Sequence, residues 1–122
     1  MHESSKIDRE KTCPFLLRVF LQHGRHNRPE KFECIRDLEQ VLVHTWKDAT
    51  LLELLGLISE KYPEALTSKC SFRLVYLNKL RREFEYKEVG CLSVGNPGRD
   101  ATRTLDDIRF IIGDYIDIAL YK

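Results

Sequence analysis

IDREKTCPFLLRVF, residues 7–20, is the stretch that decides how this chain folds. Proline lacks an N–H and biases the residue before it away from the helical region, so Pro14 marks the start of a β-strand. The apolar residues 15–21 form that strand. The charged residues 7–13 are not required by the strand, so they are candidates for contact with a partner.

The length and charge of the chain indicate a single globular domain. Its 122 residues are 43% hydrophobic and 32% charged, which is typical of folded proteins. The 20 Lys and Arg residues nearly balance 19 Asp and Glu residues, and a net charge of +1 provides no overall attraction to nucleic acid or anionic lipid. We expect residues 1–12 to be a flexible charged segment and residues 13–122 to form the domain. No apolar run approaches the ~20 residues that would cross a membrane.

The sequence predicts neither a metal site nor a cofactor. The four cysteines are Cys13, Cys34, Cys70 and Cys91. No two of them form a C-x-x-C pair, and we expect free, mostly buried thiols in a reducing compartment. His23 and His26 have the spacing of half a zinc site, but no suitable second pair follows, so a solvated loop is the favoured interpretation.

One helix and five strands can be predicted. Thr50 and Glu53 fit a capping box, apolar residues then recur at helical spacing, and Pro63 ends the helix near Tyr62. The strands are expected at residues 15–21, 41–46, 71–77, 84–91 and 115–121. A single apolar stripe can cover one face of one sheet, and the strand–helix–strand passage favours a right-handed crossover. The predicted class is therefore α+β: a ubiquitin-like β-grasp fold with a mixed sheet of about five strands and one main helix on one face. A small open barrel is the weaker alternative.

Strand periodicity assigns side chains to the two faces of the predicted sheet. The residues predicted to face the helix are Leu17, Val19, Ile116 and Ile118. The residues predicted to face away are Arg18, Phe20, Asp117 and Ala119. If the second face is exposed, Phe20 is a natural anchor for a partner.

Two basic clusters are further candidates for binding. The first is the segment between the first two strands, with Arg25, His26 and Arg28, and it could meet phosphates or an acidic partner helix. The second surrounds Arg81 and Arg82 in the turn after residue 77. RNA binding through these basic loops is the alternative function, although the charge–ring alternation there is also typical of an edge strand. The predicted partner-binding residues are Arg18, Phe20, Arg25, His26, Arg28, Arg81, Arg82 and Asp117.

No catalytic motif is recognisable. A serine nucleophile would be expected in a G-x-S-x-G elbow, and the sequence has none. The segment Gly95-Asn96-Pro97-Gly98 lacks the Gly-Lys-Ser/Thr ending of a phosphate-binding loop. We therefore predict that the chain is not an enzyme.

Several ordered segments resemble one known family. They are the opening run 7–20, TWKDATLLEL at 45–54, YPEA at 62–65, YKEVG at 86–90 and IGDYIDIA at 112–119. Together they resemble the Sin-three-associated polypeptides of eighteen kilodaltons, which are histone deacetylase complex subunits with a ubiquitin-like fold.

The resemblance implies a non-enzymatic adaptor in the nucleus, with the cytoplasm as a second compartment. It implies protein partners: Sin-three corepressor subunits, an acinus-type or pinin-type scaffold, and a serine-rich RNA-binding protein of the exon junction complex. RNA would be contacted only indirectly, no membrane would be involved, and the isolated chain is expected to be a monomer.

Overall fold

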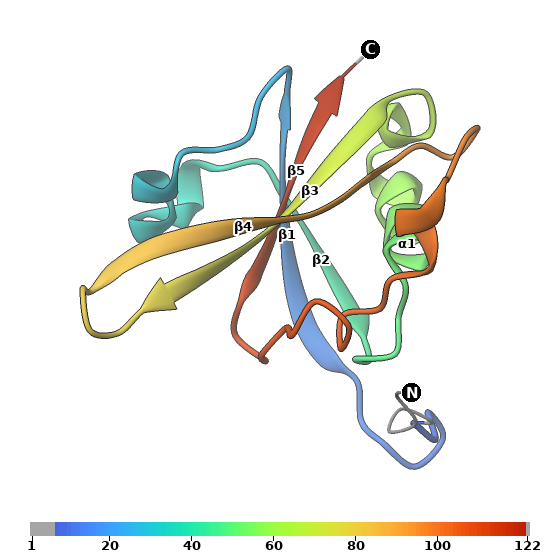
Figure 1. Cartoon of the computed structure of the whole chain (residues 1–122), viewed down its shortest axis with the longest axis horizontal. Helices are drawn as coiled ribbons and strands as arrows, with labels where there is room; N and C mark the ends of the chain where they lie inside the picture. Colours follow the sequence, from blue (N-terminus) through green and yellow to red (C-terminus); the bar gives the residue numbers. More distant parts are fainter. Residues whose placement is uncertain (1–6, 122) are drawn as a thin grey trace.

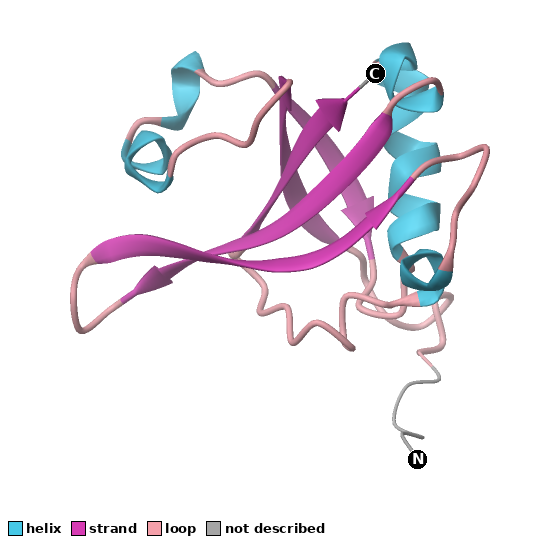
Figure 2. Cartoon of the chain, turned by 45° about the horizontal axis from the view of Figure 1, so that its top comes forward, coloured by secondary structure: helices cyan, strands magenta, loops and turns pink. Residues whose placement is uncertain are grey.

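The structure is a computed structural model that describes residues 7–121, so residues 1–6 of the predicted flexible segment lie outside the described residues. The elements are β1 (Phe15–His23), η1 (Pro29–Glu33), η2 (Ile35–Asp37), β2 (Gln40–Thr45), α1 (Leu51–Lys61), η3 (Pro63–Leu66), β3 (Lys69–Asn78), β4 (Glu83–Leu92), η4 (Arg99–Thr102) and β5 (Tyr115–Tyr121). The predicted order of five strands and one main helix is confirmed, and α1 lies on one side of the sheet (Figures 1 and 2).

The five strands form one mixed sheet in the order β2-β1-β5-β3-β4. The first and last strands of the chain are neighbours in the middle of the sheet, where β1 and β5 run parallel and Val19 pairs with Ile116. The other neighbouring pairs are antiparallel. This topology confirms the predicted ubiquitin-like β-grasp arrangement.

The helix begins at the predicted cap, but only half of the capping box forms. The Thr50 hydroxyl accepts a hydrogen bond of 3.0 Å from the backbone N–H of Glu53. The Glu53 carboxylate instead accepts from the guanidinium of Arg9 at 2.9 Å, a charge-assisted partner that is stronger than a backbone N–H. The helix ends before Pro63, as the sequence predicts.

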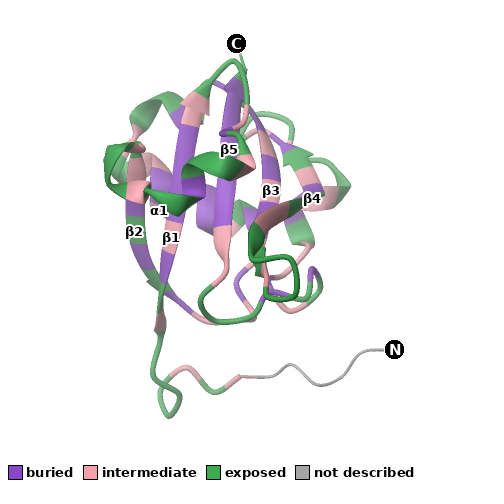
Figure 3. Ribbon diagram, turned by 90° about the vertical axis from the view of Figure 1, so that its left-hand side faces the viewer, coloured by how far each residue is buried: buried purple, intermediate pink, exposed green. Residues whose placement is uncertain are grey.

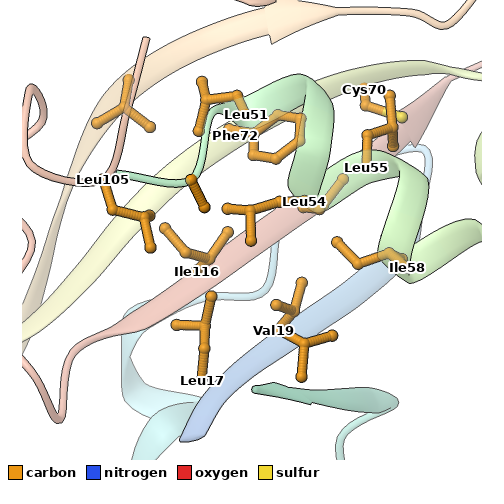
Figure 4. Packing of buried hydrophobic residues seen from close by; sticks show 14 of the residues in the cluster. Leu17, Val19, Leu51, Leu54, Leu55, Ile58, Cys70, Phe72, Leu105 and Ile116 are labelled. Carbon is orange, nitrogen blue, oxygen red and sulfur yellow. The ribbon is translucent and has the colours of Figure 1, made fainter. Parts of the chain in front are cut away.

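The main core lies between α1 and the sheet. Leu54, Leu55 and Ile58 on α1 are fully buried, and Figure 4 shows them above Val19 of β1 and Ile116 of β5. Fully burying a side chain of this size stabilises the fold by about 1.5–3 kcal/mol, so this layer is the main source of stability.

The opposite face of the sheet is also covered. Residues 24–39, which we call the cover loop, contain η1 and η2 and lie on this side (Figures 1 and 3). Phe32 of the cover loop packs edge-on against Phe20, with ring centroids 5.1 Å apart. Phe20 and Asp117 are 0% exposed. The predicted faces of the strands are correct, but the expectation that Phe20 and Asp117 lie on an exposed face is wrong, because the cover loop adds a second small core there.

The charged approach to β1 is attached to the start of the helix. The Arg9 guanidinium donates to Asp48 at 2.7 Å and to Glu53 at 2.9 Å. It also lies over the ring of Trp46, 4.8 Å from the centroid, and the Trp46 indole N–H donates to the carbonyl of Thr12 at 2.7 Å. Hydrogen bonds to Glu53 and Asp48 raise the pKa of Arg9 above its ordinary value. The predicted flexibility of the segment stays a prediction, and these contacts attach its described part to the start of the helix.

Candidate protein-docking groove

A concave apolar surface lies where the β3–β4 hairpin faces the loop that precedes β5. We call it the hairpin groove, and its volume is about 530 Å³. Its apolar lining includes Leu74, Leu77, Phe84, Ile111, Ile112 and Tyr115, and its charged lining consists of Lys79, Lys87, Arg109 and Asp114. A cavity of this size, with mostly apolar walls and a few charged groups, is typical of a ligand site.

The groove exists because β3 and β4 extend beyond the start of β5. The pairing of β3 with β5 ends at Val75 and Tyr115. The next residues of β3, 76–78, pair only with β4, so the hairpin projects from the sheet (Figure 2). The edge of β3 next to β5 is therefore unpaired over these residues, and an unpaired edge can accept another strand.

The tip of the hairpin is held by Asn78. Its side-chain oxygen accepts from the backbone N–H groups of Leu80 at 3.1 Å and Arg81 at 3.2 Å, and its carbonyl accepts from the N–H of Arg82 at 2.7 Å. Both arginines are exposed. They lie at the tip and do not line the groove, although Lys79 beside them does.

The opposite wall is a turn that points two isoleucines outward. Phe110 is buried and stacks on Phe15 with centroids 5.3 Å apart, whereas Ile111 and Ile112 are 67% and 61% exposed. Gly113 has φ +108°, a conformation that a residue with a side chain rarely adopts, and it lets the chain reverse into β5. Neighbouring large apolar residues with this exposure are typical of an interaction site.

The groove is positively charged around its apolar lining. Lys79, Lys87 and Arg109 are exposed, and none of them forms a salt bridge with another residue of the described chain. Burial raises the pKa of Asp114, although the N–H of Ile111 and the nearby charge of Lys87 lower it. The site therefore has three cations without a salt bridge to any described residue and one partly desolvated carboxylate, which favours a ligand that brings negative charge.

A second polar cluster lies under the cover loop. The buried Asp117 carboxylate accepts from Nδ1 of His26 at 2.8 Å, from the Asn27 side chain at 2.8 Å and from the Asn27 backbone N–H at 3.1 Å. Nε2 of His26 lies 3.0 Å from the Ser71 hydroxyl.

This Asp–His–Ser order is that of a hydrolase triad, but we interpret it as an anchor for the cover loop. Ser71 is the third residue of β3, paired with Cys91 on one side and Ala119 on the other. The carboxylate also holds Asn27, which a triad does not require.

The remaining predicted residues fall into separate places. Arg18 is half-buried on β1 and donates to the side chain of Gln40 at 2.8 Å. Arg25 and Arg28 are exposed on the cover loop on either side of the buried His26 and Asn27. The sequence analysis missed the groove: its only signal is the apolar pair Ile111-Ile112 directly before a glycine turn.

The described residues contain no group of three or more His, Cys, Asp or Glu side chains placed to hold a metal ion. Within residues 7–121, no helix is both long and apolar enough to cross a membrane.

The sheet order, the single main helix and the groove define a ubiquitin-like domain with a concave apolar surface. The model of the family "Sin3 associated polypeptide p18 (SAP18)" matches residues 6–120, and the chain belongs to this family.

Several relatives from distant organisms are similar to the chain. A mouse protein is 43% identical over 118 residues, covering 93% of this chain and 77% of the relative. A Drosophila melanogaster protein is 37% identical over 118 residues, covering 94% and 79%. An Arabidopsis thaliana protein is 41% identical over 123 residues, also covering 94% and 79%. Each of these relatives is named "Histone deacetylase complex subunit SAP18".

Proposed function

We propose that this chain is a non-enzymatic adaptor subunit of histone deacetylase complexes that binds an apolar partner segment with acidic flanks in the hairpin groove. The names of its relatives support membership of such a complex. The family resemblance supports Sin-three corepressor subunits as partners, a nuclear location, and a second association with an acinus-type or pinin-type scaffold and a serine-rich RNA-binding protein of the exon junction complex.

The observation that carries the docking site is the exposure of Ile111 and Ile112 opposite an unpaired strand edge. An extended peptide could add its backbone to residues 76–78 of β3 and place apolar side chains between the isoleucines and Leu77. Acidic residues beside that apolar core would meet Lys79 and Lys87. Cations at the rim contribute mainly to association rate and specificity, whereas the buried apolar anchor contributes most of the affinity.

Affinity purification from nuclear extract tests the proposal when Ile112→Asp is compared with the unchanged chain. Ile112 is 61% exposed, so the substitution leaves the fold intact while it places a charge in the groove. Losing an anchor worth about 2 kcal/mol lowers partner affinity by roughly 30-fold, and recovery of deacetylase-complex and splicing-complex subunits is counted by mass spectrometry.

Leu66→Asp is the matched control because Leu66 is 48% exposed on η3, outside the groove. The control should recover the same subunits as the unchanged chain. Equal recovery with Ile112→Asp would contradict the groove as the docking site, and the absence of deacetylase subunits from the unchanged chain would contradict the adaptor role.

A further inference from the structure

A second hollow lies at the start of the cover loop, next to the end of β1. It is lined by Gln22 of β1 and by Arg25, His26, Arg28 and Lys31, and its volume is about 270 Å³. We call it the basic hollow. It shares no lining residue with the hairpin groove, so it is a separate candidate site.

The basic hollow brings three positive charges together. Arg25, Arg28 and Lys31 are exposed, and none of them forms a salt bridge with a described residue. Glu30, the acidic residue within this stretch, does not line the hollow. Three like charges around one depression repel one another, and an anion bound among them would remove that repulsion. This concentration stands out because the whole chain has a net charge of only +1.

The backbone that carries the two arginines is fixed before any ligand arrives. His26 and Asn27, which separate Arg25 from Arg28, are both held by the buried Asp117 carboxylate. The N–H of Gly24 donates to the carbonyl of Leu120 at 2.8 Å and fixes the start of the loop. A site ordered in this way loses little backbone entropy on binding, which favours affinity for a small ligand.

The chemistry of the basic hollow favours a phosphoryl group. Arginine guanidinium groups bind phosphate through paired N–H donors, and Lys31 adds a point charge. A hollow of 270 Å³ accommodates one phosphoryl group and the side chain that carries it. RNA recognition would in addition use exposed rings for base stacking. Among the described lining residues His26 alone has a ring, and both of its nitrogens already have partners.

We propose that the basic hollow binds the phosphoryl group of a phosphorylated peptide segment of a partner protein. The site would make one contact of the adaptor dependent on phosphorylation of its partner. This contact is separate from the hairpin groove, and it does not require the proposed groove ligand.

A fluorescein-labelled peptide of glycine and serine with one central phosphoserine tests the proposal by anisotropy with the full chain. We expect it to bind at least ~10-fold more tightly than the unphosphorylated peptide. Arg25→Ala with Arg28→Ala should remove that difference in affinity, because it removes the two guanidinium groups of the hollow. Both side chains are exposed, so the melting curve of the double variant should be unchanged. Lys11→Ala with Arg99→Ala removes two exposed cations elsewhere and should keep the difference. Ile112→Asp should also keep it, which separates this site from the groove.

Titration with inorganic phosphate, followed by backbone amide NMR, locates the site independently. Shifts at millimolar phosphate that are confined to residues 22–31 support the proposal. Equal affinity for the two peptides, equal losses in the two double variants, or shifts spread over all basic residues would overturn it. Tighter binding of a single-stranded RNA oligonucleotide than of the phosphopeptide would also overturn it, in favour of nucleic-acid recognition.

Discussion

The Asp117 carboxylate lies 2.8 Å from Nδ1 of His26, although 91 positions separate the two residues in the sequence. Asp117 is in β5, at the centre of the sheet, and His26 is in the cover loop. This contact joins the last strand to the loop that follows the first strand. It therefore holds the cover loop against the face of the sheet on which Phe20 lies.

Replacement of Asp117 should release the cover loop. Asp117→Ala leaves His26 and both Asn27 donors without their buried acceptor, and each buried donor left without a partner costs about 1–3 kcal/mol, so a loss of at least about 3 kcal/mol is expected. Urea unfolding measures the loss, and hydrogen exchange at the Asn27 amide reports the loop.

Ser71→Ala is the control, because it removes only the outer hydrogen bond to His26 and should cost about 1 kcal/mol. Equal losses in the two variants would show that Asp117 does not anchor the loop.

The two central strands could be predicted because each is a mostly apolar run that directly follows a turn or strand-start signal, Pro14 before β1 and Gly113-Asp114 before β5. In β1 and β5 the apolar residues on one face are matched by the helix stripe, and the capping residue Thr50 fixes where that stripe begins. These are local signals, and together with the right-handed crossover rule they favour the β-grasp order.

The cover loop and the groove could not be predicted in the same way. Phe32, Ile35 and Leu38 are apolar residues scattered through a charged segment, and nothing local indicates that Phe32 packs on Phe20. The groove results from the end of β3–β5 pairing at Val75, and a register offset between distant strands has no sequence signature. Packing between residues that are distant in the sequence therefore determines both the cover loop and the groove, and strand periodicity does not reveal it.

Three of the four cysteines should react quickly with a thiol reagent in the native protein, and the fourth should not. Cys13, Cys34 and Cys91 are exposed, so the expectation of mostly buried thiols is wrong for these three. Cys70 is buried, and burial raises its pKa to about 11, so its thiolate is scarce at pH 8. Titration with a thiol-reactive disulfide should show three fast groups and a fourth that reacts only on unfolding. Fast reaction of all four in the native protein would contradict the burial of Cys70.

The contact between Arg9 and the start of the helix should be modest in free energy. Arg9→Ala removes pairs to Asp48 and Glu53 that are partly exposed, and such pairs contribute 0.2–1 kcal/mol each, so a total loss of about 1 kcal/mol is expected. Limited proteolysis should then cleave within residues 7–12 faster than in the unchanged chain. Lys11→Ala, which removes an exposed charge from the same segment, should leave cleavage unchanged.

The Asp114 carboxyl group, which lines the groove, should make the stability of the fold depend on pH. Burial raises its pKa above the ordinary value of 3.8, so the folded state holds its proton more strongly than the unfolded state. Its contribution therefore favours folding below that value and is lost as the pH rises through the raised pKa. Asp114→Asn keeps an acceptor for the N–H of Ile111 and should be slightly more stable than the unchanged chain at pH 7, but not at pH 3. A gain of the same size at both pH values would rule out this origin.

Gly90 is required by close packing rather than by backbone conformation. It lies in β4 beside a bulge, where Phe72 pairs with Gly90 but Arg73 pairs with Glu88. A Cβ at position 90 would lie 2.8 Å from the Leu51 side chain and 3.0 Å from Cβ of Asp100. Gly90→Ala should therefore push α1 and η4 away from the strand, with a loss of about 1–3 kcal/mol in urea unfolding.

Gly56→Ala should act in the opposite direction. Gly56 lies in α1, and a Cβ there would meet nothing within 4 Å. The substitution adds no clash and improves helix propensity, so a gain of up to about 1 kcal/mol is expected. If Gly90→Ala lowers the free energy of unfolding and Gly56→Ala raises it, the short distances at position 90 explain why glycine is required there. The general effect of adding a methyl group would not explain it. A neutral Gly90→Ala would mean that Leu51 and Asp100 can move aside, and the packing of α1 against β4 would then be looser than these distances indicate.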